Sequence, residues 1–340
     1  MYCEFFGFKE KPFTITPNPR FIFLSKTHKE VFAHLLYGVR SHCGFIEITG
    51  EVGTGKTTAL RTLLNQLESD SYRLALIFNP SLSALELLRS INAEFGIEST
   101  AASAADLLSA LNSFLLRENT AGRTVVLVID EAQNLQPAVL EQIRMLSNLE
   151  TETDKLIQII LVGQPELGVI LGRAELRQLS QRITVRYHLR PMDFDDTRAY
   201  ILHRLEVAGS RGGVVFTPRA ARKIYRDSSG YPRLINILCD RSLLVAYTEN
   251  SHEINLSMVN TAIQELKQQA GRRNRWRLWP TVAVILAALA IVGGYLAWRP
   301  TSVAPVSASA VTGSIVLPAG QEDGRHAKPN TTGTSSGDES

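Results

Sequence analysis

The sequence predicts an α/β domain built on a parallel sheet, followed by a small all-helical domain. Three observations predict this class. Residues 50–57 fit G-x-x-x-x-G-K-[ST], the pattern of a phosphate-binding P-loop. Residues 124–131 form an unbroken apolar, β-branched run that ends in two acids, which is typical of a buried parallel strand. Beyond Pro191 the apolar periodicity is helical up to about residue 270.

The composition fits a folded chain of about two domains. There are 340 residues, 44% of them hydrophobic, and the net charge of +3 is too small to argue for nucleic acid. Cys3, Cys43 and Cys239 lack metal-binding spacing, so we expect buried free thiols in a reducing compartment. The seven histidines do not cluster, so we expect no zinc site. The opening residues do not predict a secretory signal.

The first 25 residues are rich in phenylalanine and proline, and the prolines exclude a long helix. We therefore expect an extended segment laid across a hydrophobic surface. Two interpretations stay open for it. One is a cover over a nucleotide base, and the other is simple packing of the N-terminus onto the core.

Apolar spacing predicts the other elements of the α/β domain. The predicted helices are residues 28–39, 58–66, 84–95, 104–117, 137–149 and 176–182. The predicted strands are residues 45–49, 72–79, 124–131, 156–163 and 183–189. Either Ser103 or the alanines beside it begin the helix at residues 104–117.

The P-loop lies between a predicted strand and a predicted helix, as its pattern requires. Its glycines permit backbone angles at which N–H groups converge on an anion, and the following helix adds partial positive charge. We expect Lys56 to reach the β- and γ-phosphates and the Thr57 hydroxyl to bind Mg²⁺. The expected nucleotide-binding residues are Gly50, Glu51, Val52, Gly53, Thr54, Gly55, Lys56, Thr57 and Thr58. The alternative is a glycine turn followed by a chance Lys-Thr pair.

The acids that end residues 124–131 lie where parallel α/β sheets bind ligands, at the carboxyl end of a strand. We expect Asp130 to hold Mg²⁺ through water, and Glu131 to polarise the attacking water as a general base. The alternative is a strand followed by an acidic turn. About 75 residues separate the P-loop from this pair.

Three further polar residues are candidates for catalysis. Gln164 follows a predicted strand and could hold the attacking water or sense the γ-phosphate, unless Gln164-Pro165 simply begins a turn. Arg177 and Arg182 precede the last predicted strand, where an arginine could reach the γ-phosphate of a neighbouring subunit. Exposed, solvated arginines are the alternative, and Arg182 is preferred because it is nearest the strand.

The second domain is predicted to consist of helices alone, with no strand between them. These helices are residues 195–208, 218–228, 232–247 and 256–268. Proline at the first turn of two of them supports the assignment. Arg233, within Gly-Tyr-Pro-Arg-Leu-Ile-Asn, begins one helix and could point at the nucleotide across the domain cleft. A surface arginine is the alternative.

Residues 279–298 form an uncharged run of 20 residues with Trp279 and Trp298 at its ends. Such a run predicts a transmembrane helix with interfacial tryptophans. Four arginines precede it closely and only Arg299 follows, so we expect residues 1–277 in the cytoplasm. A buried core helix, and a nucleic-acid patch for the arginines, are the alternatives. Residues 300–340 have no apolar period and predict a disordered tail.

From residue 1 to about residue 270 the chain resembles the ExeA/GspA family of AAA+ ATPases, which is linked to bacterial type II secretion and related pilus or exopolysaccharide export. Five motifs carry the resemblance. They are Met-Tyr-x-x-Phe-Phe-Gly-Phe-x-x-Lys-Pro-Phe-x-x-x-Pro-x-Pro-Arg, Gly-Glu-Val-Gly-Thr-Gly-Lys-Thr-Thr, Asp-Glu-Ala-Gln-Asn-Leu, Leu-Val-Gly-Gln-Pro-Glu-Leu and Gly-Tyr-Pro-Arg-Leu-Ile-Asn.

The resemblance implies a five-stranded parallel sheet of AAA+ type with a helical lid. It implies Walker A roles for Lys56 and Thr57, Walker B roles for Asp130 and Glu131, sensor 1 at Gln164, an arginine finger at Arg182 or Arg177, and sensor 2 at Arg233. The expected divisions are an N-terminal segment (1–30), a P-loop core (31–190), a helical lid (191–270), a transmembrane helix (278–298) and a disordered periplasmic tail (299–340).

We therefore expect an ATP- and Mg²⁺-dependent ATPase, anchored by one helix in the bacterial inner membrane, that powers or regulates assembly of an export complex. An arginine finger supplied in trans implies a homo-oligomer. The resemblance implies a GspB/ExeB-like membrane partner, and we expect no nucleic acid. Two other classes stay open: a DNA-transposition ATPase with a similar core, and a nucleotide-gated scaffold that barely hydrolyses ATP.

Overall fold

A computed structural model describes residues 2–16, 18–67, 70–78, 82–98, 103–152, 154–210, 213–268, 287–291 and 293–295. Residues 1–275 form one compact unit and residues 276–340 a second. The predicted tail at residues 299–340 lies outside the described residues, as does most of the predicted membrane span at 278–298. The two described pieces of that span, 287–291 and 293–295, are helical. Within the described part of the chain, no helix has both the length and the apolar character to cross a bilayer.

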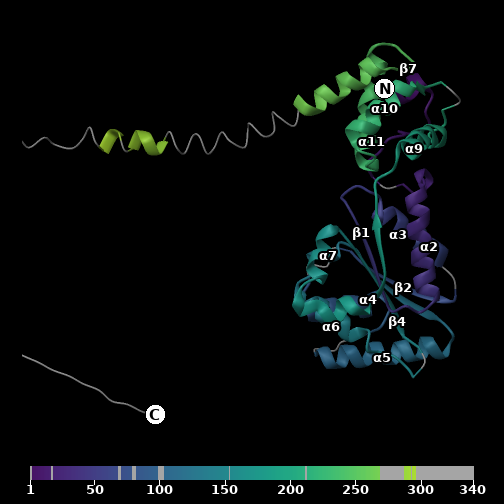
Figure 1. Cartoon of the computed structure of the whole chain (residues 1–340), viewed down its shortest axis with the longest axis vertical. Helices are drawn as coiled ribbons and strands as arrows, with labels where there is room; N and C mark the ends of the chain where they lie inside the picture. Colours follow the sequence, from purple (N-terminus) through teal and green to yellow (C-terminus); the bar gives the residue numbers. More distant parts are fainter. Residues whose placement is uncertain are drawn as a thin grey trace, which may run out of the picture. The chain divides into compact units, whose positions relative to one another are not determined.

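A five-stranded sheet lies at the centre of the first unit (Figure 1). Its strands are β1 (Phe45–Gly50), β2 (Tyr72–Ile77), β3 (Thr124–Ile129), β4 (Ile157–Gly163) and β5 (Ile183–Leu189). They are all parallel, in the order β2-β3-β4-β1-β5. The five predicted strands are therefore confirmed. β1, β3 and β4 are buried almost throughout, which explains their continuous apolar runs.

Helices cover both faces of the sheet, because alternate side chains of each buried strand point to opposite faces. Val126 and Val128 pack on one face with α2 (Lys26–Arg40) and α3 (Lys56–Leu67). Leu127 and Ile129 pack on the other face. That face is covered by α4 (Ala84–Glu94), α5 (Ala104–Thr120), α6 (Pro137–Leu146), α7 (Pro165–Leu171) and α8 (Arg177–Arg182).

One of these helices was not predicted. The turn considered at Gln164-Pro165 is instead the start of α7, with Gln164 at the N-cap and Pro165 in the first turn. Proline suits this position because the first N–H groups of a helix have no partner inside it. Ser103 is confirmed as the residue that begins α5, because its side chain accepts a hydrogen bond from the backbone N–H of Asp106.

The lid consists of α9 (Phe194–Val207), α10 (Pro218–Ser228), α11 (Pro232–Thr248) and a helix at residues 256–268. The prediction of helices alone was wrong. β6 (Val215–Phe216) precedes α10 in the chain and β7 (Glu253–Ile254) precedes the last helix. The two strands pair in parallel. Each strand has only two residues, too few for an alternating apolar pattern to show in the sequence.

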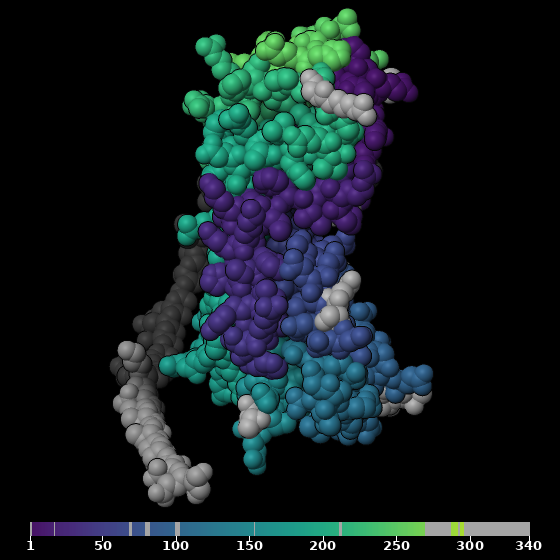
Figure 2. Space-filling view, turned by 90° about the vertical axis from the view of Figure 1, so that its right-hand side faces the viewer, coloured from purple at the N-terminus to yellow at the C-terminus, as the bar shows by residue number. Residues whose placement is uncertain are grey.

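The N-terminal strap, defined here as residues 2–16 and 18–25, completes the core of the lid. It begins with a short helix, α1 (Tyr2–Phe6), and includes the 3-10 turn Pro19–Phe21. Its buried aromatic residues share one apolar cluster with α9, α10, α11 and the last helix: Tyr2, Phe6, Phe8, Phe13 and Phe21. Figure 2 shows the N-terminal part of the chain, in purple, running from the edge of the green lid down to the blue α/β core.

A buried arginine fastens the strap to the lid. Arg204 of α9 is 6% exposed. Its Nε donates a hydrogen bond to the Pro12 carbonyl oxygen at 2.5 Å and its Nη1 to the Tyr200 hydroxyl at 2.8 Å. The guanidinium also lies 4.8 Å from the centre of the Phe21 ring. These contacts satisfy a buried cation, which would otherwise cost several kcal/mol.

The three cysteines are free thiols, as expected, but only Cys239 is buried. Cys3 and Cys43 are half-buried, so the expectation of buried thiols was wrong for them. Cys3 lies in the terminal helix α1 and Cys43 in the turn before β1, where solvent reaches one side of the chain.

Gly230, at the turn between α10 and α11, provides a test of how the lid joins the sheet. A Cβ at this position would lie 1.9 Å from the Met192 carbonyl oxygen, and φ is +75°. We expect Gly230→Ala to lower the free energy of unfolding by at least ~3 kcal/mol. Chemical denaturation followed by circular dichroism measures this value.

The matched control is Gly122→Ala, where φ is +69° but no atom lies within 4 Å of the new Cβ. Backbone strain alone should cost about 1 kcal/mol there. Equal losses at the two positions would contradict the close approach of Gly230 to Met192.

Candidate functional site

The P-loop joins the carboxyl end of β1 to the first turn of α3. Gly53 and Gly55 have φ of +84° and +98°, which side chains rarely tolerate. The Thr54 hydroxyl donates a hydrogen bond to the Glu51 carbonyl oxygen at 2.8 Å, which fixes the curve of the loop. The loop therefore presents backbone N–H groups and a helix N-terminus at the edge of the sheet.

Lys56 is held at this loop by its own backbone. Its Nζ donates hydrogen bonds to the carbonyl oxygens of Gly50, at 2.7 Å, and Glu51, at 3.1 Å. Burial lowers the pKa of Lys56, whereas the nearby carboxylates of Glu131 and Asp130 act in the opposite direction. A cation held by two carbonyl oxygens, without a direct ion pair among the described residues, is therefore placed where the loop would receive an anion.

Thr57 and Asp130 lie beside each other, as expected. The Thr57 hydroxyl donates a hydrogen bond to Asp130 Oδ2 at 3.0 Å, and Asp130 Oδ1 accepts one from the Glu131 backbone N–H at 2.9 Å. Burial raises the pKa of Asp130, and these two hydrogen bonds oppose that shift. A hydroxyl oxygen next to a carboxylate fits the oxygen ligands that Mg²⁺ prefers.

Glu131 is positioned by two glutamines. It has a left-handed backbone, with φ of +54°, which is uncommon for a residue other than glycine. Its Oε2 accepts hydrogen bonds from Gln133 Nε2 at 2.6 Å and from Gln164 Nε2 at 3.2 Å. Gln133 Oε1 in turn accepts from the Gln164 backbone N–H at 3.0 Å. Glu131, two residues after β3, is thus tied to Gln164, the residue that follows β4.

Gln133 is a site residue that the sequence reasoning missed. Its only signal was its place in Asp-Glu-Ala-Gln, two residues after the proposed base. The structure adds a close approach at Gly163, where a Cβ would lie 2.8 Å from Gln133 Oε1. The glycine that ends β4 therefore leaves the room that this glutamine occupies.

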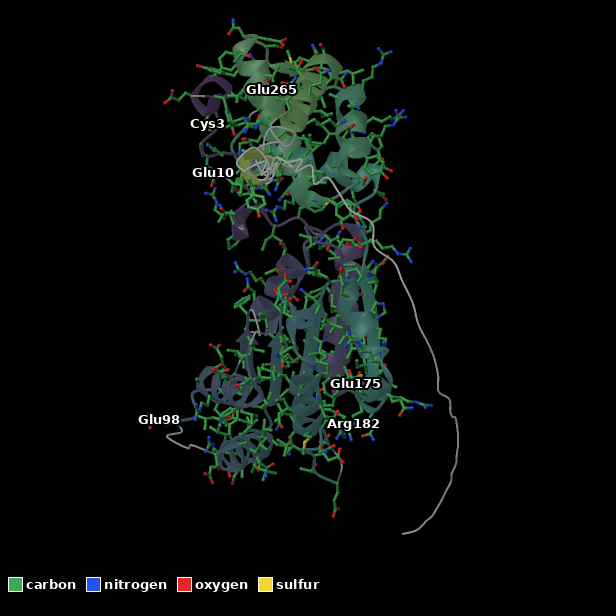
Figure 3. All side chains as sticks on the ribbon, turned by 90° about the vertical axis from the view of Figure 1, so that its left-hand side faces the viewer. Cys3, Glu10, Glu98, Glu175, Arg182 and Glu265 are labelled. Atoms are coloured by element: carbon green, nitrogen blue, oxygen red, sulfur yellow. The ribbon has the colours of Figure 1, made fainter. Side chains whose placement is uncertain are left out.

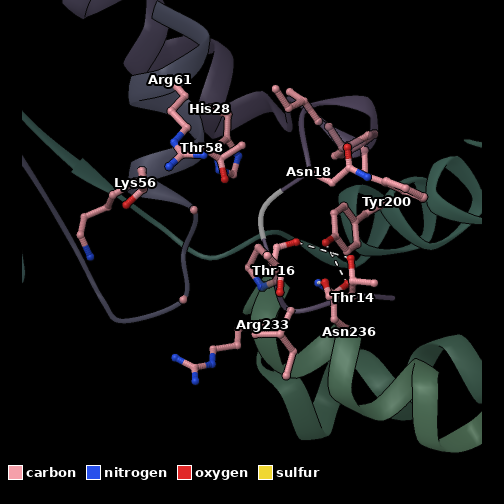
Figure 4. A pocket seen from close by; sticks show the side chains of 18 of the residues that line it. Thr14, Thr16, Asn18, His28, Lys56, Thr58, Arg61, Tyr200, Arg233 and Asn236 are labelled. Atoms are coloured by element: carbon pink, nitrogen blue, oxygen red, sulfur yellow. Dashed lines mark hydrogen bonds between the residues drawn. The ribbon is translucent and has the colours of Figure 1, made fainter. Parts of the chain in front are cut away.

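Arg233 brings the lid to the P-loop. It lies in the first turn of α11, and a Cβ at Gly53 would come within 3.0 Å of the Arg233 Cβ. Among the described residues, no carboxylate forms an ion pair with it. Figure 4 shows the Arg233 and Lys56 side chains in the same pocket, coming from the lid and the core respectively.

A cavity of about 640 Å³ connects these groups, a size that suits a nucleotide. Six of the nine expected loop residues line it: Val52, Gly53, Gly55, Lys56, Thr57 and Thr58. Glu131, Gln164 and Arg233 also line it. Gly50, Glu51 and Thr54 do not line it, but Gly50 and Glu51 supply the carbonyl oxygens that hold Lys56.

The far end of the cavity is built from the strap and the lid. Tyr200 donates a hydrogen bond to Asn236 Oδ1 at 2.9 Å, and Asn236 Nδ2 donates to the Thr14 carbonyl oxygen at 3.2 Å (Figure 4). These residues line the cavity together with Ile15 and Phe23 of the strap. The strap therefore packs into the lid core and also lines this end of the cavity, and Phe21 does both. A cover over a nucleotide base stays a prediction.

His28 packs directly against the P-loop at Gly55. It is 2% exposed, and a Cβ on Gly55 would lie 2.6 Å from His28 Nε2. Ser25 Oγ lies 2.6 Å from His28 Nδ1. Burial lowers the pKa of His28 from 6.5 to about 4, so the imidazole under the loop is neutral at pH 7.

Arg182 and Arg177 are not brought to this cavity. They belong to α8, which precedes the amino end of β5, whereas the P-loop follows the carboxyl end of β1. Arg182 Nη1 donates a hydrogen bond to Ser147 Oγ at 2.5 Å, and Arg177 is exposed. Figure 3 shows Arg182 beside Glu175, at the end of the first unit away from the lid.

Comparison with known proteins agrees with this geometry. Residues 39–171 match the family model described as an AAA domain. General secretion pathway protein A of Aeromonas hydrophila is 44% identical over 301 residues, which are 88% of this chain and 54% of that protein. The resemblance to the ExeA/GspA-like AAA+ ATPases is therefore confirmed. The chain spans about half the length of that relative.

Solved structures show the AAA+ fold over a larger part of the chain than the family model. Cdc6p from Pyrobaculum aerophilum matches with a TM-score of 0.58 and 19% identity, covering 74% of this chain and 71% of that one. The ADP form of the Aeropyrum pernix ORC2 protein matches with a TM-score of 0.57 and 18% identity, covering 76% and 73%. At these identities the likeness shows the fold alone.

The hydrogen bonds of Gln133 predict a specific effect on catalysis. Gln133→Ala removes one of the two donors that orient the Glu131 carboxylate, so we expect ATP turnover to fall about tenfold or more. Equilibrium binding of ATP should stay within about twofold of wild type, because Gln133 does not line the cavity. Phosphate release and nucleotide binding by the full-length protein measure both values.

Gln136→Ala is the matched control, because Gln136 is exposed and its side chain makes no capping hydrogen bond. An equal loss of turnover in both variants would rule out a positioning role for Gln133.

The buried His28 predicts acid sensitivity of the fold. The unfolded chain takes up a proton near pH 6.5, but the folded chain does so only near pH 4. The free energy of unfolding should therefore fall by up to ~3 kcal/mol as the pH drops through this window. His28→Asn should flatten this dependence in denaturation curves at pH 7, 6 and 5. His42→Asn, at an exposed histidine, should retain the wild-type slope, and a wild-type slope in His28→Asn would disprove the assignment.

Proposed function

We propose that this chain is a membrane-anchored ATPase that powers or regulates the assembly of a bacterial secretion or export complex. One observation carries the proposal. Lys56, Glu131 and Gln164 line a cavity that Arg233 of the lid also lines, and Asp130 accepts a hydrogen bond from Thr57 beside them. A site that combines a P-loop, paired acids and an arginine from the lid is suited to hydrolysis of a nucleoside triphosphate.

The chain's own residues divide the chemistry between them. The loop amides and Lys56 bind the β- and γ-phosphates of ATP and stabilise the charge that develops there. Glu131 orients the attacking water and accepts its proton, with its carboxylate held by Gln133 and Gln164. Gln164, which lines the cavity and donates a hydrogen bond to Glu131, would sense the γ-phosphate.

Thr57 and Asp130 are the residues that would hold Mg²⁺. Their oxygen atoms already lie 3.0 Å apart, and Asp130 is 3% exposed at the end of β3. When bound, the ion neutralises charge on the phosphate oxygens. A Thr57→Val change would remove one of the two oxygens while keeping the shape of the side chain.

Arg233 would couple the position of the lid to the state of the nucleotide. It is carried by α11, whereas Gly53, which it approaches, belongs to the P-loop. A γ-phosphate between them would draw the guanidinium towards the core, and hydrolysis would release it. The lid angle, together with the strap fastened to it by Arg204, would then report the state of the nucleotide.

The arginine finger is proposed to act on a neighbouring subunit. Arg182 lies at the amino edge of the sheet, so it cannot serve the P-loop of its own chain, which lies at the carboxyl edge. Its half-buried position and its hydrogen bond to Ser147 give it a fixed direction. Arg177 is exposed and makes no such contact with the described residues, so Arg182 is the better candidate. This role requires a homo-oligomer.

Membrane attachment and export partners are proposed from the sequence and from the relative. Residues 279–298 are uncharged and flanked by tryptophans, as a single-pass anchor would be. The Aeromonas hydrophila relative is named general secretion pathway protein A. We infer an inner-membrane protein with a cytoplasmic ATPase domain, a short periplasmic tail and a GspB/ExeB-like partner.

Two substitutions test the ATPase. Lys56→Ala should weaken ATP binding at least about a hundredfold, because it removes the only cation held within the loop backbone. Glu131→Gln should bind ATP with near wild-type affinity but lower turnover by about a hundredfold or more. Both are measured on the full-length protein in lipid nanodiscs, by fluorescent nucleotide binding and by phosphate release.

The outcomes separate the proposal from its alternative. Undiminished ATP affinity in Lys56→Ala would overturn the binding site itself. Wild-type binding without turnover, even for the oligomer in lipid, would identify a nucleotide-gated scaffold rather than an enzyme.

A further inference from the structure

The outer face of α10 is unusually basic. Arg219, Arg222 and Arg226 are exposed and follow one another at spacings of three and four residues, which places them on one side of the helix. The opposite side, with Ala220 and Ile224, is buried in the lid core. The helix is therefore fixed in rotation by its apolar side, and the row of guanidinium groups must point outwards.

These three arginines lack acidic partners. Among the described residues, the only ion pair of this helix joins Lys223 to Asp227 at 2.7 Å. Arg222 lies over the Phe194 ring, with its guanidinium carbon 5.1 Å from the ring centre. That contact supports the alkyl stem and the planar group but leaves the charge uncompensated. The like charges in this row repel one another and so destabilise the lid, and an anionic partner would relieve that repulsion.

The topology places the start of α10 beside the start of the last lid helix, through which the chain leaves the lid. β6 and β7 pair in parallel, and α10 and the helix at residues 256–268 begin two residues after each of them. The two helices therefore start side by side, and Ala220 and Met258 belong to the same apolar cluster. Figure 1 shows both at the end of the first unit opposite α5 and α6.

The length of the connecting chain limits how far the lid can move from a bilayer. Ten residues, 269–278, separate the last lid helix from the uncharged run at residues 279–298. Ten residues reach at most ~35 Å, and the 13-residue helix itself is ~20 Å long. Four arginines lie within or beside this connection: Arg272, Arg273, Arg275 and Arg277.

We propose that the Arg219, Arg222 and Arg226 face of α10 is a docking surface for the anionic headgroups of the membrane that anchors the chain. This inference rests on the proposed membrane anchor. The tether holds α10 within a few tens of ångströms of the headgroups, so even weak attractions act at high effective concentration. Each arginine near an anionic bilayer contributes a similar small attraction, and three in a row act together.

The docking surface would link the nucleotide-dependent lid angle to the membrane surface. α10 packs on α11, and α11 carries Arg233. A change in lid angle at Arg233 would therefore change how the basic face meets the headgroups. Nucleic acid offers the same phosphate chemistry, but the short tether to an apolar span favours the lipid surface.

The test is photo-crosslinking of the full-length protein in vesicles. One set contains phosphatidylcholine alone and the other equal parts phosphatidylcholine and phosphatidylglycerol, each with a trace of its own headgroup-photoreactive analogue. Mass spectrometry should find adducts on residues 218–228 at least about tenfold more often in the anionic vesicles. They should disappear as salt rises from about 0.1 M to about 1 M, because the screening length falls from ~10 Å to ~3 Å.

Variants with matched charge give the controls. Arg219→Glu, Arg222→Glu and Arg226→Glu together should abolish the adducts. Arg40→Glu, Arg89→Glu and Arg117→Glu change the net charge equally at exposed positions of α2, α4 and α5, and should leave them intact. Because Arg222 packs on Phe194, a second variant changes only Arg219→Gln and Arg226→Gln and should lower the yield about fivefold.

Three results would overturn the inference. They are equal adducts in the two kinds of vesicle, equal losses in the α10 and control triples, and protection of α10 by a DNA duplex in place of lipid. An alkaline wash separates this inference from the proposed anchor. If the protein is washed off, both fail, and if it stays embedded without adducts on α10, only the docking surface fails.

Discussion

The parallel pairing of β1 with β4, and of β4 with β3, sends the carboxyl ends of three strands to one edge of the sheet. The P-loop follows β1, Glu131 lies in the turn after β3, and Gln164 follows β4. Their side chains meet because the parallel register of the sheet aligns these strand ends. Every contact at the site, including the Gln133 bridge, depends on that alignment.

The strap and the turn at Gly230 hold the lid against this edge of the sheet. Met192 N–H donates a hydrogen bond to the Gly230 carbonyl oxygen at 3.0 Å, which joins the chain leaving β5 to the start of α11. Arg204 and Asn236 then hold the strap by its backbone carbonyls. These polar contacts to main-chain atoms join the strap to the lid at this end of the cavity. A change in lid angle would therefore move strap and lid together.

The sequence predicted the parts of this arrangement that repeat a local pattern. The five strands, the P-loop and the acid pair could be found because burial on both faces demands continuous apolar runs and phosphate binding demands glycines at fixed spacing. β6 and β7 could not, since two residues carry no period. Nor could the roles of Gln133, His28 and Arg204, because each depends on contacts between segments that are distant in sequence. The α7 helix was missed because its proline suggested only a turn.

The strap has a consequence for how the protein is made. Five aromatic side chains from the first 21 residues belong to a core whose other members run to Ile263. On the ribosome, these rings must wait for roughly 240 further residues, which takes at least about ten seconds at ordinary synthesis rates. During that interval they are unburied, so the nascent N-terminus is an obvious client for a chaperone. The lid closes its core only as the apolar run at residues 279–298 is about to emerge.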